Sequence, residues 1–462
     1  MKKSKFQRPT GMDDILPEDQ IYYQKIYEVV SNIADFYGFL KIDTPIVEEE
    51  ELFSRGVGLG TDIVKKEMYS FKTKSGDRLA LRPEWTSSVM RAYIENGMHN
   101  LPQPVKLWYF GPCYRYERPQ YARRRQFWQF GFEVIGEKNP IIDTQIIQIF
   151  YNILLELKLK NLTVEINSIG DNNCRPYYKK LLKKYFTKKA SSLCVNCKRR
   201  LKENILRIFD CKEERCQGIK TDAPQILDYL CEDCRKHLKS VLEFLDEVEI
   251  PYNLDSCLVR GLDYYTRTVF EIFSVNKKET DTDKDKKENN KKDNKNNNNE
   301  KEDFKKDDKE ENLKSLALVG GGRYDKLSKM LGGKDTPACG GAAGVERIID
   351  LMKIEKVKVL QEKKIEVFLA QLGDLAKKKS LKILEDFRKA KIRVGEVFGR
   401  DSLRSQLNRA DRLGVKYALI LGQKEALEGV IIVRNMEDGT QETVKIDKVV
   451  SEVKKRLRVN RG

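Results

Sequence analysis

Histidine is almost absent from this chain of 462 residues, which contains only His99 and His237. Neither lies in a motif with other reactive side chains, so we do not expect histidine to act as a general base. His237 follows a pair of cysteines on a predicted helix. We expect it at the helix surface, with metal ligation as the alternative. The chemistry of the chain must therefore rest on other residue types.

Two further absences each exclude a class of protein. No apolar run approaches the roughly 20 residues that a membrane-spanning helix needs, and residues 1–5 are not followed by the apolar core of a signal peptide. We therefore expect a cytoplasmic protein without membrane contact. The Gly-x-x-x-x-Gly-Lys-Ser/Thr loop is also absent, so any ATP site must use another mode of binding.

The composition is that of a globular protein with several domains and a basic surplus. Hydrophobic residues make up 40% of the chain, and 462 residues suggest about two to four domains. Lys and Arg total 88 against 71 Asp and Glu, which gives a net charge of +17. A surplus of this size favours a polyanionic partner through phosphate contacts, although a merely soluble basic protein would share it.

One segment, Asn276 to Lys314, differs in composition from the rest of the chain. It contains 13 lysines, 13 acidic residues and 9 asparagines, and very few apolar side chains. We predict that residues 276–314 are disordered and inserted at the tip of a hairpin between the strand-like segments 268–275 and 315–319. Because its charges cancel, the whole net charge belongs to the folded remainder.

Ten cysteines are present, and six of them fall between residues 194 and 234. Two C-x-x-C pairs have the spacing of a tetrathiolate zinc site, since each pair can present two thiolates to one edge of a tetrahedron. The pattern predicts one structural zinc ion on the four cysteines of these pairs, Cys194, Cys197, Cys231 and Cys234. A third pair, Cys211 and Cys216, could replace one of them. The alternative is that the cysteines are buried as small hydrophobic residues.

The most specific signal is a run of polar and aromatic residues at a tight turn, Arg260-Gly261-Leu262-Asp263-Tyr264-Tyr265. A second stretch runs from Tyr114 to Gln120 and continues from Arg123 to Glu133. Strand alternation there places four polar side chains on one face, Arg115, Glu117, Gln129 and Glu133. Two glycine clusters follow, at residues 320–325 and 340–347. Such a polar face is either exposed to solvent or lines a cleft, and the aromatic density around it favours a cleft.

Together these stretches resemble the histidine-specific signature, motif 2 and motif 3 of histidyl-tRNA synthetases, which are class II aminoacyl-tRNA synthetases. The resemblance implies an α+β catalytic core with a mostly antiparallel sheet, formed by residues 1–170 and 251–351, with a helical cysteine-rich subdomain at 171–250. Strands alternate with helices in residues 364–455. This segment resembles the α/β anticodon-binding domain of class II synthetases.

The implied function is ATP-dependent ligation of L-histidine to tRNA(His) through a histidyl-adenylate, with ATP bound as its Mg²⁺ complex. Such enzymes are generally homodimers. The helix predicted from about Pro17 to Tyr37 has an apolar stripe, and this stripe faces either a partner subunit or the chain's own core. The main alternative function is that of a histidine-binding regulatory paralogue of ATP phosphoribosyltransferase. The presence of the C-terminal domain and of the full signature disfavours it.

The resemblance also assigns roles to individual residues. Arg115 and Arg260 would be catalytic, bracing the α-phosphate from opposite sides and contacting histidine. Glu133 and Tyr265 would hold the imidazole ring, with Tyr264 beside them. Three residues would receive the α-amino group, namely Glu84, Thr86 and Gln129. Arg347 would cover the adenine or the γ-phosphate, and Arg323 would assist on the phosphate side. Arginine suits these roles because its planar guanidinium binds phosphate oxygens in pairs and stays charged.

Overall fold

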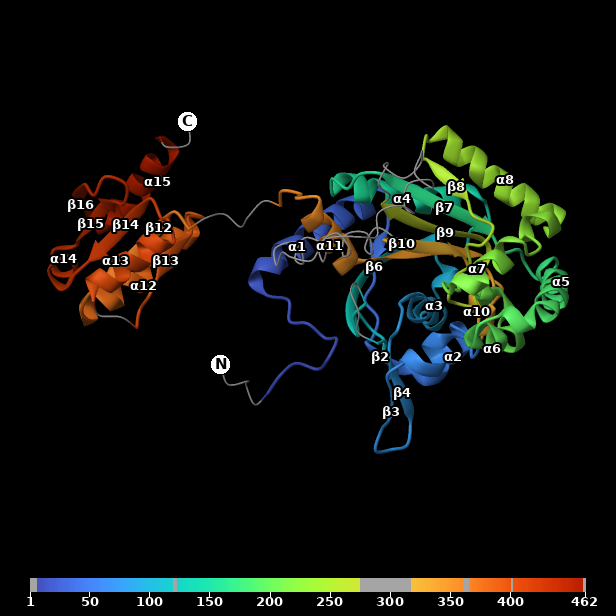
Figure 1. The fold of residues 1–462 in the computed structure, drawn as a ribbon. Helices are drawn as coiled ribbons and strands as arrows, with labels where there is room; N and C mark the ends of the chain where they lie inside the picture. The colour runs from blue at the N-terminus through green and yellow to red at the C-terminus, as the bar shows by residue number, and fades with distance from the viewer. Residues whose placement is uncertain (1–5, 119–122, 275–316, 360–364, 400–401, 460–462) are drawn as a thin grey trace, which may run out of the picture. The chain divides into compact units, whose positions relative to one another are not determined.

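The computed structural model describes residues 6–118, 123–274, 317–359, 365–399 and 402–459. The predicted insertion at 276–314 lies outside the described residues. By its internal contacts the chain separates into two compact units, Met1–Val359 and Leu360–Gly462, which are described separately below (Figure 1). No described helix is both long and apolar enough to cross a membrane.

The first unit is built on an eight-stranded sheet in the order β1-β5-β6-β11-β10-β9-β7-β8. Within this sheet, as far as the structure describes it, only the outer pairs β1–β5 and β7–β8 are parallel, so the prediction of a mostly antiparallel sheet is confirmed. The strands are β1 (Leu40–Lys41), β5 (Val105–Tyr114), β6 (Gln126–Ile135), β11 (Ala338–Gly344), β10 (Val319–Arg323), β9 (Thr266–Ser274), β7 (Leu162–Ser168) and β8 (Tyr252–Leu254).

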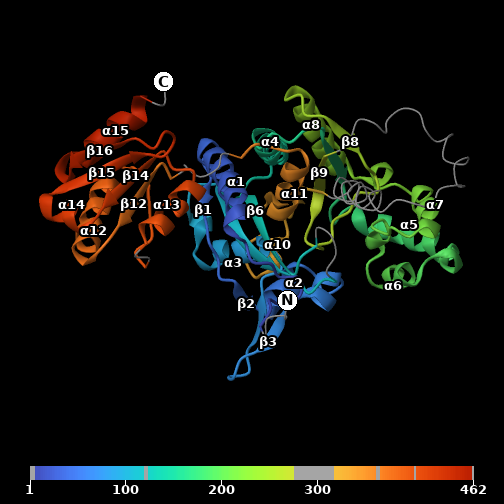
Figure 2. The ribbon, with the colours of Figure 1, turned by 60° about the vertical axis from the view of Figure 1, so that its left-hand side comes forward.

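Helices cover one face of this sheet, as Figure 2 shows for α1, α4, α8 and α11. Their bounds are α1 (Pro17–Phe36), α4 (Ile141–Glu156), α8 (Glu232–Glu247) and α11 (Val345–Ile354). Proline at the first position of α1 and two acidic residues in its first turn favour helix initiation there. The apolar stripe of α1 packs into the chain's own core through Ile26, Val30 and Ile33, which settles the alternative left open by the sequence.

Smaller elements accompany the eight-stranded sheet. They are a three-stranded sheet of β2 (Val47–Glu49), β4 (Arg78–Leu81) and β3 (Ser70–Lys72), and the helices α2 (Glu50–Gly56), α3 (Thr86–Glu95) and α10 (Leu327–Met330). Short π and 3₁₀ turns occur at Ile63–Glu67 and Met98–Asn100. A second apolar cluster joins α3 and α10 to the inner face of β5 and β9.

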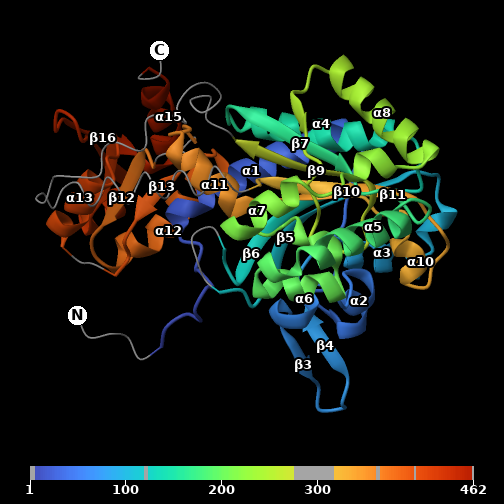
Figure 3. The same ribbon diagram turned by 45° about the vertical axis from the view of Figure 1, so that its right-hand side comes forward.

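The cysteine-rich region is helical, as predicted, and has a small core of its own. It contains α5 (Arg175–Lys188), α6 (Val195–Glu203) and α7 (Glu214–Thr221), and 3₁₀ turns at Ala190–Ser192, Ile205–Ile208 and Ile226–Tyr229. Helix α8 follows and returns the chain to the sheet (Figure 3). Six of the buried residues in this core are cysteines, Cys174, Cys194, Cys197, Cys211, Cys216 and Cys234.

The second unit is an α/β domain with a five-stranded sheet in the order β13-β12-β14-β15-β16. The first three strands are parallel, whereas β15 and β16 are antiparallel additions that the sequence analysis did not identify. The strands are β12 (Val367–Gln371), β13 (Val394–Glu396), β14 (Tyr417–Leu421), β15 (Val430–Asn435) and β16 (Gln441–Lys445). The helices are α12 (Asp374–Lys389), α13 (Leu403–Arg412), α14 (Gln423–Glu428) and α15 (Val449–Val459), with a 3₁₀ turn at Ile446–Lys448.

Candidate active site

Strand β6 carries two polar side chains on the sheet face that the four helices leave uncovered. Side chains alternate along a strand, so Gln129 and Glu133 project from the same face. The neighbouring strand β11 places Gly340 opposite Glu133 and Gly344 opposite Gln129. A Cβ atom at Gly340 would lie 1.8 Å from Glu133 Oε2 and 2.5 Å from the Phe132 carbonyl oxygen. Glycine is therefore required here for the close approach of a carboxyl group.

The Glu133 carboxyl is fully buried and surrounded by hydroxyl groups. Thr86 Oγ1 donates to Glu133 Oε1 over 2.8 Å, and the Tyr109 hydroxyl donates to the same oxygen over 3.2 Å. The Tyr324 hydroxyl donates to Oε2. Burial raises the pKa of Glu133 to about 8, although the three hydroxyl groups oppose that shift. At neutral pH the group is thus mostly a neutral carboxyl that can donate a hydrogen bond as well as accept one.

The two tyrosines of the signature are buried in the same apolar cluster as Tyr109 and Tyr324. The ring centroids of Tyr264 and Tyr265 are 4.6 Å apart, and the Tyr264 ring lies 5.6 Å from that of Tyr324. Burial raises the pKa of Tyr265 to about 12, so its phenol stays protonated and can donate. Arg175 donates to the Tyr265 carbonyl oxygen over 2.8 Å. The cysteine-rich region thereby holds the backbone that carries this tyrosine.

A cavity of about 180 Å³ lies along the same side of the sheet, at the end of β6 that carries Gln129. Its charged lining consists of Arg115, Arg123, Arg124, Arg260, Arg347, Glu117, Glu271 and Glu346. Burial raises the pKa of Glu271 above its ordinary value and that of Glu346 to about 7. Five guanidinium groups therefore outweigh the carboxylates, and the cavity suits a ligand with several negative charges.

Arg260 is positioned in this cavity by a carboxylate and a glycine. Its guanidinium pairs with Glu271 on β9, and its carbon Cζ lies 5.9 Å from the centre of the Tyr265 ring. The guanidinium crosses β10 at Gly320, where a Cβ atom would come within 2.2 Å of Arg260 Nη2. The ion pair with Glu271 raises the pKa of Arg260 although burial opposes it, so the side chain stays charged.

Arg115 and Arg347 are held by backbone carbonyl groups. Arg115 Nε donates to the Pro83 oxygen over 2.9 Å, and its Cζ lies 5.2 Å from the centre of the Phe127 ring. Arg347 Nη1 donates to the Ala317 oxygen over 2.8 Å. Strand β5 ends at Tyr114, so Arg115 projects from the chain just beyond the strand.

The three residues expected at the α-amino group occupy different environments. Glu84 is buried and caps helix α3, accepting the backbone N–H groups of Thr86 over 2.6 Å and of Ser87 over 2.9 Å. Thr86 contacts Glu133 as described above. Gln129 lines the cavity, and its Oε1 accepts the Cys113 thiol over 3.4 Å. Only Gln129 among the three lines the cavity itself.

Sequence reasoning missed two contributors to this site, Tyr109 and Tyr324. Tyr324 belongs to the glycine-rich run at 320–325, and Tyr109 has the same strand parity as Arg115, so both signals were present. The Tyr109 ring stacks on Trp85 with centroids 4.6 Å apart and an interplanar angle of 10°. The Arg82 guanidinium lies 3.4 Å from the centre of the Trp85 ring, and it donates a hydrogen bond to the Thr44 carbonyl oxygen. A layered stack thus supports the Glu133 side of the pocket.

Arg323 does not join the other arginines. Its side chain is fully buried on the helix-covered face, where Nε lies 3.0 Å from Asp143 Oδ2 and Nη1 and Nη2 donate to the Glu137 carbonyl oxygen. His237 Nε2 lies 3.1 Å from the other Asp143 oxygen. His237 is therefore buried against α4, and the prediction of a surface position was wrong. The phosphate role expected of Arg323 has no support in this placement.

The cysteines form two clusters, and neither is the predicted set. Cys194 and Cys197 meet Cys211 and Cys216, whereas Cys231 and Cys234 meet Cys174 and Asp171. The two C-x-x-C pairs therefore belong to different clusters. The prediction of one site on Cys194, Cys197, Cys231 and Cys234 was wrong, because α6 and α8 begin at separate places in the subdomain.

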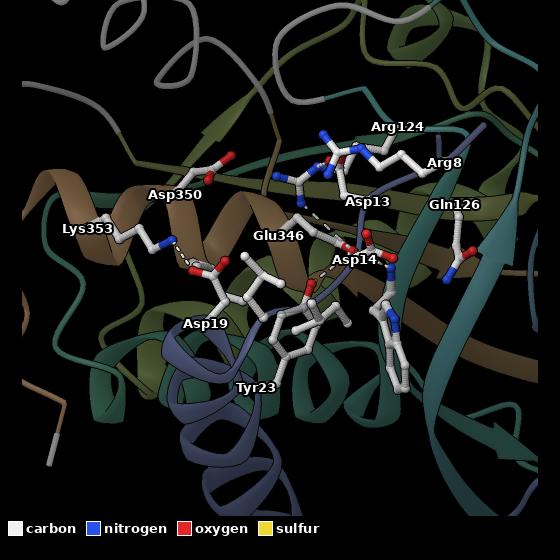
Figure 4. Close-up of a pocket in the computed structure, with 14 residues that line it drawn as sticks. Arg8, Asp13, Asp14, Asp19, Tyr23, Arg124, Gln126, Glu346, Asp350 and Lys353 are labelled. Atoms are coloured by element: carbon white, nitrogen blue, oxygen red, sulfur yellow. Dashed lines mark hydrogen bonds and ion pairs between the residues drawn. The ribbon is translucent and has the colours of Figure 1, made fainter. Parts of the chain in front are cut away.

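A second cavity, of about 240 Å³, lies between the N-terminal segment and α11. Figure 4 shows Tyr23 pointing toward Glu346, which accepts its hydroxyl over 3.2 Å, and Lys353 reaching Asp19 over 2.6 Å. Arg124 and Glu346 line this cavity as well as the first one. The N-terminal segment thus contributes to the wall next to the arginine-lined cavity.

Comparisons with known proteins show a full-length likeness to one family. The family model described as histidyl-tRNA synthetase matches residues 11–280, and that of an anticodon binding domain matches residues 366–456. A histidine–tRNA ligase of Dehalococcoides mccartyi is 41% identical over 455 residues, which are 98% of this chain and 100% of that protein. A histidine–tRNA ligase of Caldicellulosiruptor saccharolyticus is also 41% identical, again over 98% of this chain and 100% of its relative.

Solved structures agree with the sequence comparisons. The apo histidyl-tRNA synthetase of S. aureus has a TM-score of 0.73 and 33% identity, covering 97% of this chain and 99% of that one. A Bacillus halodurans protein described as an ATP phosphoribosyltransferase regulatory subunit/histidyl-tRNA synthetase has a TM-score of 0.58 at 18% identity. At that identity the likeness shows the fold alone.

Proposed function

This chain belongs to the histidyl-tRNA synthetase family and ligates L-histidine to tRNA with ATP, and we propose that the pocket around Glu133 and the arginine-lined cavity are where histidine is activated. The observation that carries the proposal is the adjacency of two unlike environments along β6. A buried carboxyl with phenol neighbours lies at Glu133, and a surplus of guanidinium groups lies at Gln129. A non-catalytic regulatory paralogue is not favoured, because ligases match the chain from end to end.

The histidine side of the site selects an imidazole through paired donors and acceptors. Glu133 and Tyr265 hold the two ring nitrogens in this proposal, with Tyr264 packed beside them. A site with buried polar partners rejects an apolar side chain strongly, since those partners would be left without hydrogen bonds. Thr86 and Tyr109 position the Glu133 carboxyl through their hydrogen bonds. Gln129 binds the α-amino group in this proposal, because the Glu84 carboxylate already accepts hydrogen bonds from the N-terminus of α3.

The ATP side of the site needs no nucleophilic side chain. The carboxylate of histidine attacks the α-phosphate, a P–O bond to pyrophosphate breaks, and the protein supplies orientation and positive charge. Arg115 and Arg260 brace the developing negative charge, and Arg347 lies at the start of α11 where it can cover the nucleotide. ATP enters as its Mg²⁺ complex, and Glu117 and Glu271 supply the oxygen ligands that Mg²⁺ prefers. Arg323 has no part in this proposal.

The remaining partners follow from the family. Residues 364–455 correspond to the anticodon-binding domain in this proposal, and the net charge of +17 assists binding of tRNA(His) through phosphate contacts. We further propose a cytoplasmic homodimer. Phe36 and Leu40 are 80% and 71% exposed at the end of α1 and on the edge strand β1, and a second subunit would cover them. Light scattering at micromolar concentration would show a monomer if this is incorrect.

ATP–pyrophosphate exchange with each amino acid tests substrate and reaction together. Histidine alone should support exchange, and Arg260→Ala should reduce its rate roughly 100-fold or more through lost transition-state charge contacts. Arg55→Ala is the control, because Arg55 lies outside both cavities and pairs with an exposed glutamate on its own helix. Normal exchange by Arg260→Ala would remove the proposed role of this arginine. Exchange with another amino acid would overturn the proposed specificity.

Deleting residues 360–462 tests the division of labour between the two units. The first unit has its own sheet and apolar cores, so it should keep some adenylate formation. Charging of tRNA should be abolished, since the contacts with the anticodon arm would be gone. Unchanged charging by the shortened chain would contradict the role proposed for residues 364–455.

A further inference from the structure

Four cysteine sulfurs meet inside the cysteine-rich region. Cys194, Cys197, Cys211 and Cys216 are all buried, and their Sγ atoms lie within 4.8 Å of one another. The Sγ atoms of Cys194 and Cys211 are 3.8 Å apart. A tetrahedral zinc ion with Zn–S bonds of about 2.3 Å places its sulfur ligands about 3.8 Å apart. The four side chains thus have the spacing that one ion requires.

Backbone N–H groups support this first cluster. The Cys197 N–H donates to Cys194 Sγ over 3.3 Å, and the Cys194 N–H donates to Cys216 Sγ over 3.4 Å. Such bonds favour the thiolate form, which is the form that binds metal. Cys194 is the N-cap of α6, so the helix terminus adds a further favourable potential for a thiolate.

The second cluster combines three sulfurs with one carboxylate. Cys174 and Cys234 Sγ are 3.9 Å apart, and Asp171 Oδ1 lies 3.7 Å from Cys174 Sγ and 3.8 Å from Cys231 Sγ. With Zn–S near 2.3 Å and Zn–O near 2.1 Å, a tetrahedral ion would set about 3.8 Å between sulfurs and about 3.6 Å between sulfur and oxygen. Both kinds of distance agree with these values to within about 0.2 Å.

We propose that the cysteine-rich region binds two zinc ions per chain, one on Cys194, Cys197, Cys211 and Cys216 and the other on Asp171, Cys174, Cys231 and Cys234. Four protein ligands complete each tetrahedron, so both sites are structural and leave no open position for catalysis. This inference goes beyond the proposed function and does not depend on it.

Disulfides do not account for these clusters. The cysteines are free, and the Sγ–Sγ separations of 3.8 and 3.9 Å are far from the S–S bond length of about 2.05 Å. An iron–sulfur cluster anchors its cysteines on different iron atoms, which separates the sulfurs further than a single ion does. Thiolate ligands in tetrahedral sets favour zinc among the divalent ions that carry no redox chemistry.

The two ions would have different consequences. The first ion links the start of α6 to α7 and to the loop that contains Cys211. The apolar core of this region is small. The second joins the starts of α5 and α8 to Asp171, which also lies 3.4 Å from Arg267 at its Oδ2 atom. The Arg267 N–H donates to Gly170, next to Asp171, over 2.8 Å. Arg267 follows Tyr265 by two residues, so the second ion braces the start of β9, directly after this tyrosine.

Elemental analysis of the full-length chain, purified under reducing conditions without chelators, is the primary test. We expect about two zinc ions per chain for the unmodified protein, and about one for either Cys211→Ser or Cys174→Ser. Cys257→Ser is the matched control, since Cys257 packs against the same apolar core but belongs to neither cluster, and it should keep both ions. A zinc content clearly below one per chain that does not rise on incubation with zinc chloride would overturn the proposal.

A second measurement covers the case in which a single variant fails to fold. Unmodified protein, stripped of metal and titrated with Co²⁺, should take up two equivalents and develop thiolate-to-cobalt charge-transfer absorption from seven sulfur ligands. Asp171→Asn should keep that absorption but bind one of the two ions more weakly, roughly 10-fold or more. Uptake of a single equivalent would refute one of the two sites. Absence of the charge-transfer band would refute both.

The KM for histidine distinguishes loss of the second zinc site from loss of the first. Cys174→Ser should raise KM for histidine in pyrophosphate exchange several-fold, because the brace next to Tyr265 is lost. Cys211→Ser should leave KM close to that of Cys257→Ser. Equal KM values for Cys174→Ser and Cys257→Ser, with one ion lost from the former, would contradict the bracing role.

Discussion

Glu133 and Asp143 are two fully buried carboxyl groups in the first unit, yet their pKa values move in opposite directions. Burial raises the pKa of Glu133 to about 8, because its partners are neutral hydroxyl groups. Burial also acts on Asp143, but the Arg323 guanidinium and His237 outweigh it and hold the pKa of Asp143 below its ordinary value. Asp143 has its counter-charge within the protein. Among the described residues no positively charged side chain forms an ion pair with Glu133.

The two groups also lie on opposite faces of the sheet. Gly340 and Cys339 are adjacent on β11, where Gly340 faces Glu133, and Cys339 belongs to the helix-covered core beside Arg323. Side-chain alternation therefore separates a buried ion pair from a buried carboxyl with neutral hydroxyl partners by a single residue. We conclude that a partner of opposite charge, and not burial alone, decides whether the pKa of a buried carboxyl in this sheet is lowered, as for Asp143, or raised, as for Glu133.

The largest effect should come from Gly340→Ala, which pushes a methyl group against the Glu133 carboxyl. The new Cβ would lie 1.8 Å from Oε2 and 2.5 Å from a backbone oxygen, so the carboxyl must move by about 1 Å or more. A displacement of this size costs roughly 100-fold in kcat/KM for histidine activation. Pyrophosphate exchange measures the loss, and Gly218→Ala is the control because nothing lies within 4 Å of its added Cβ. Full activity of Gly340→Ala would show that Glu133 does not contact substrate.

Much of this arrangement was predictable from the sequence, because neighbouring residues in a motif remain neighbours in space. Strand alternation predicted that Gln129 and Glu133 share one face, and both lie on β6. The α/β pattern of the C-terminal unit was also predicted for its first three strands. Its last two strands follow in antiparallel order, and the sequence analysis did not extend to them.

The failures concern pairings that depend on the tertiary fold. Arg323 was grouped with the phosphate-binding arginines because it follows three glycines, but a register irregularity between Gly322 and Arg323 and strand alternation direct it to the opposite face. The spacing of the two C-x-x-C pairs suggested one shared zinc site. In the structure the segment at Cys211 lies beside the first pair, and the residues just before α5 lie beside the second. Periodicity within one segment is visible in a sequence. The choice among several similar partners is not.

Breaking the Asp143 site should change stability and leave catalysis intact. Arg323→Met removes the guanidinium that pairs with the buried Asp143, and removal of one member of a buried ion pair costs about 3–5 kcal/mol. Urea unfolding followed by tryptophan fluorescence isolates this effect, since Trp85, Trp108 and Trp128 all lie in the first unit. The KM values for ATP and histidine should match those of the unmodified protein. A raised KM for ATP without a loss of stability would restore Arg323 to the active site.

The Glu133 pocket should show a distinctive pH dependence. Free imidazole has a pKa near 6.5 and Glu133 one of about 8, and in the proposed complex the two groups share one proton. Between about pH 6.5 and 8 the Glu133 carboxyl of the free protein is protonated and the imidazole is neutral, so the carboxyl supplies the shared proton. Above pH 8 the proton must be taken up, so kcat/KM for histidine should fall about tenfold per pH unit. Glu133→Gln cannot lose a proton and should lack this alkaline limb, at a lower plateau. An unchanged limb in Glu133→Gln would assign it to another group.

The smallest effect should come from His237→Ala, which removes the weaker partner of Asp143. One hydrogen bond to a buried charged group contributes about 1.5–3 kcal/mol, while Arg323 still neutralises the carboxylate. The folded pKa of Asp143 lies below its unfolded value, so its contribution to stability is present above the unfolded pKa and is lost as the pH falls through the folded pKa. Without His237 the folded pKa moves up toward the unfolded one, and acid unfolding should begin at a higher pH. His237→Gln keeps an N–H donor and should recover part of the difference. If both variants unfold in acid like the unmodified protein, Arg323 alone holds the pKa of Asp143 low. The difference in pKa between Asp143 and Glu133 then depends on that single guanidinium.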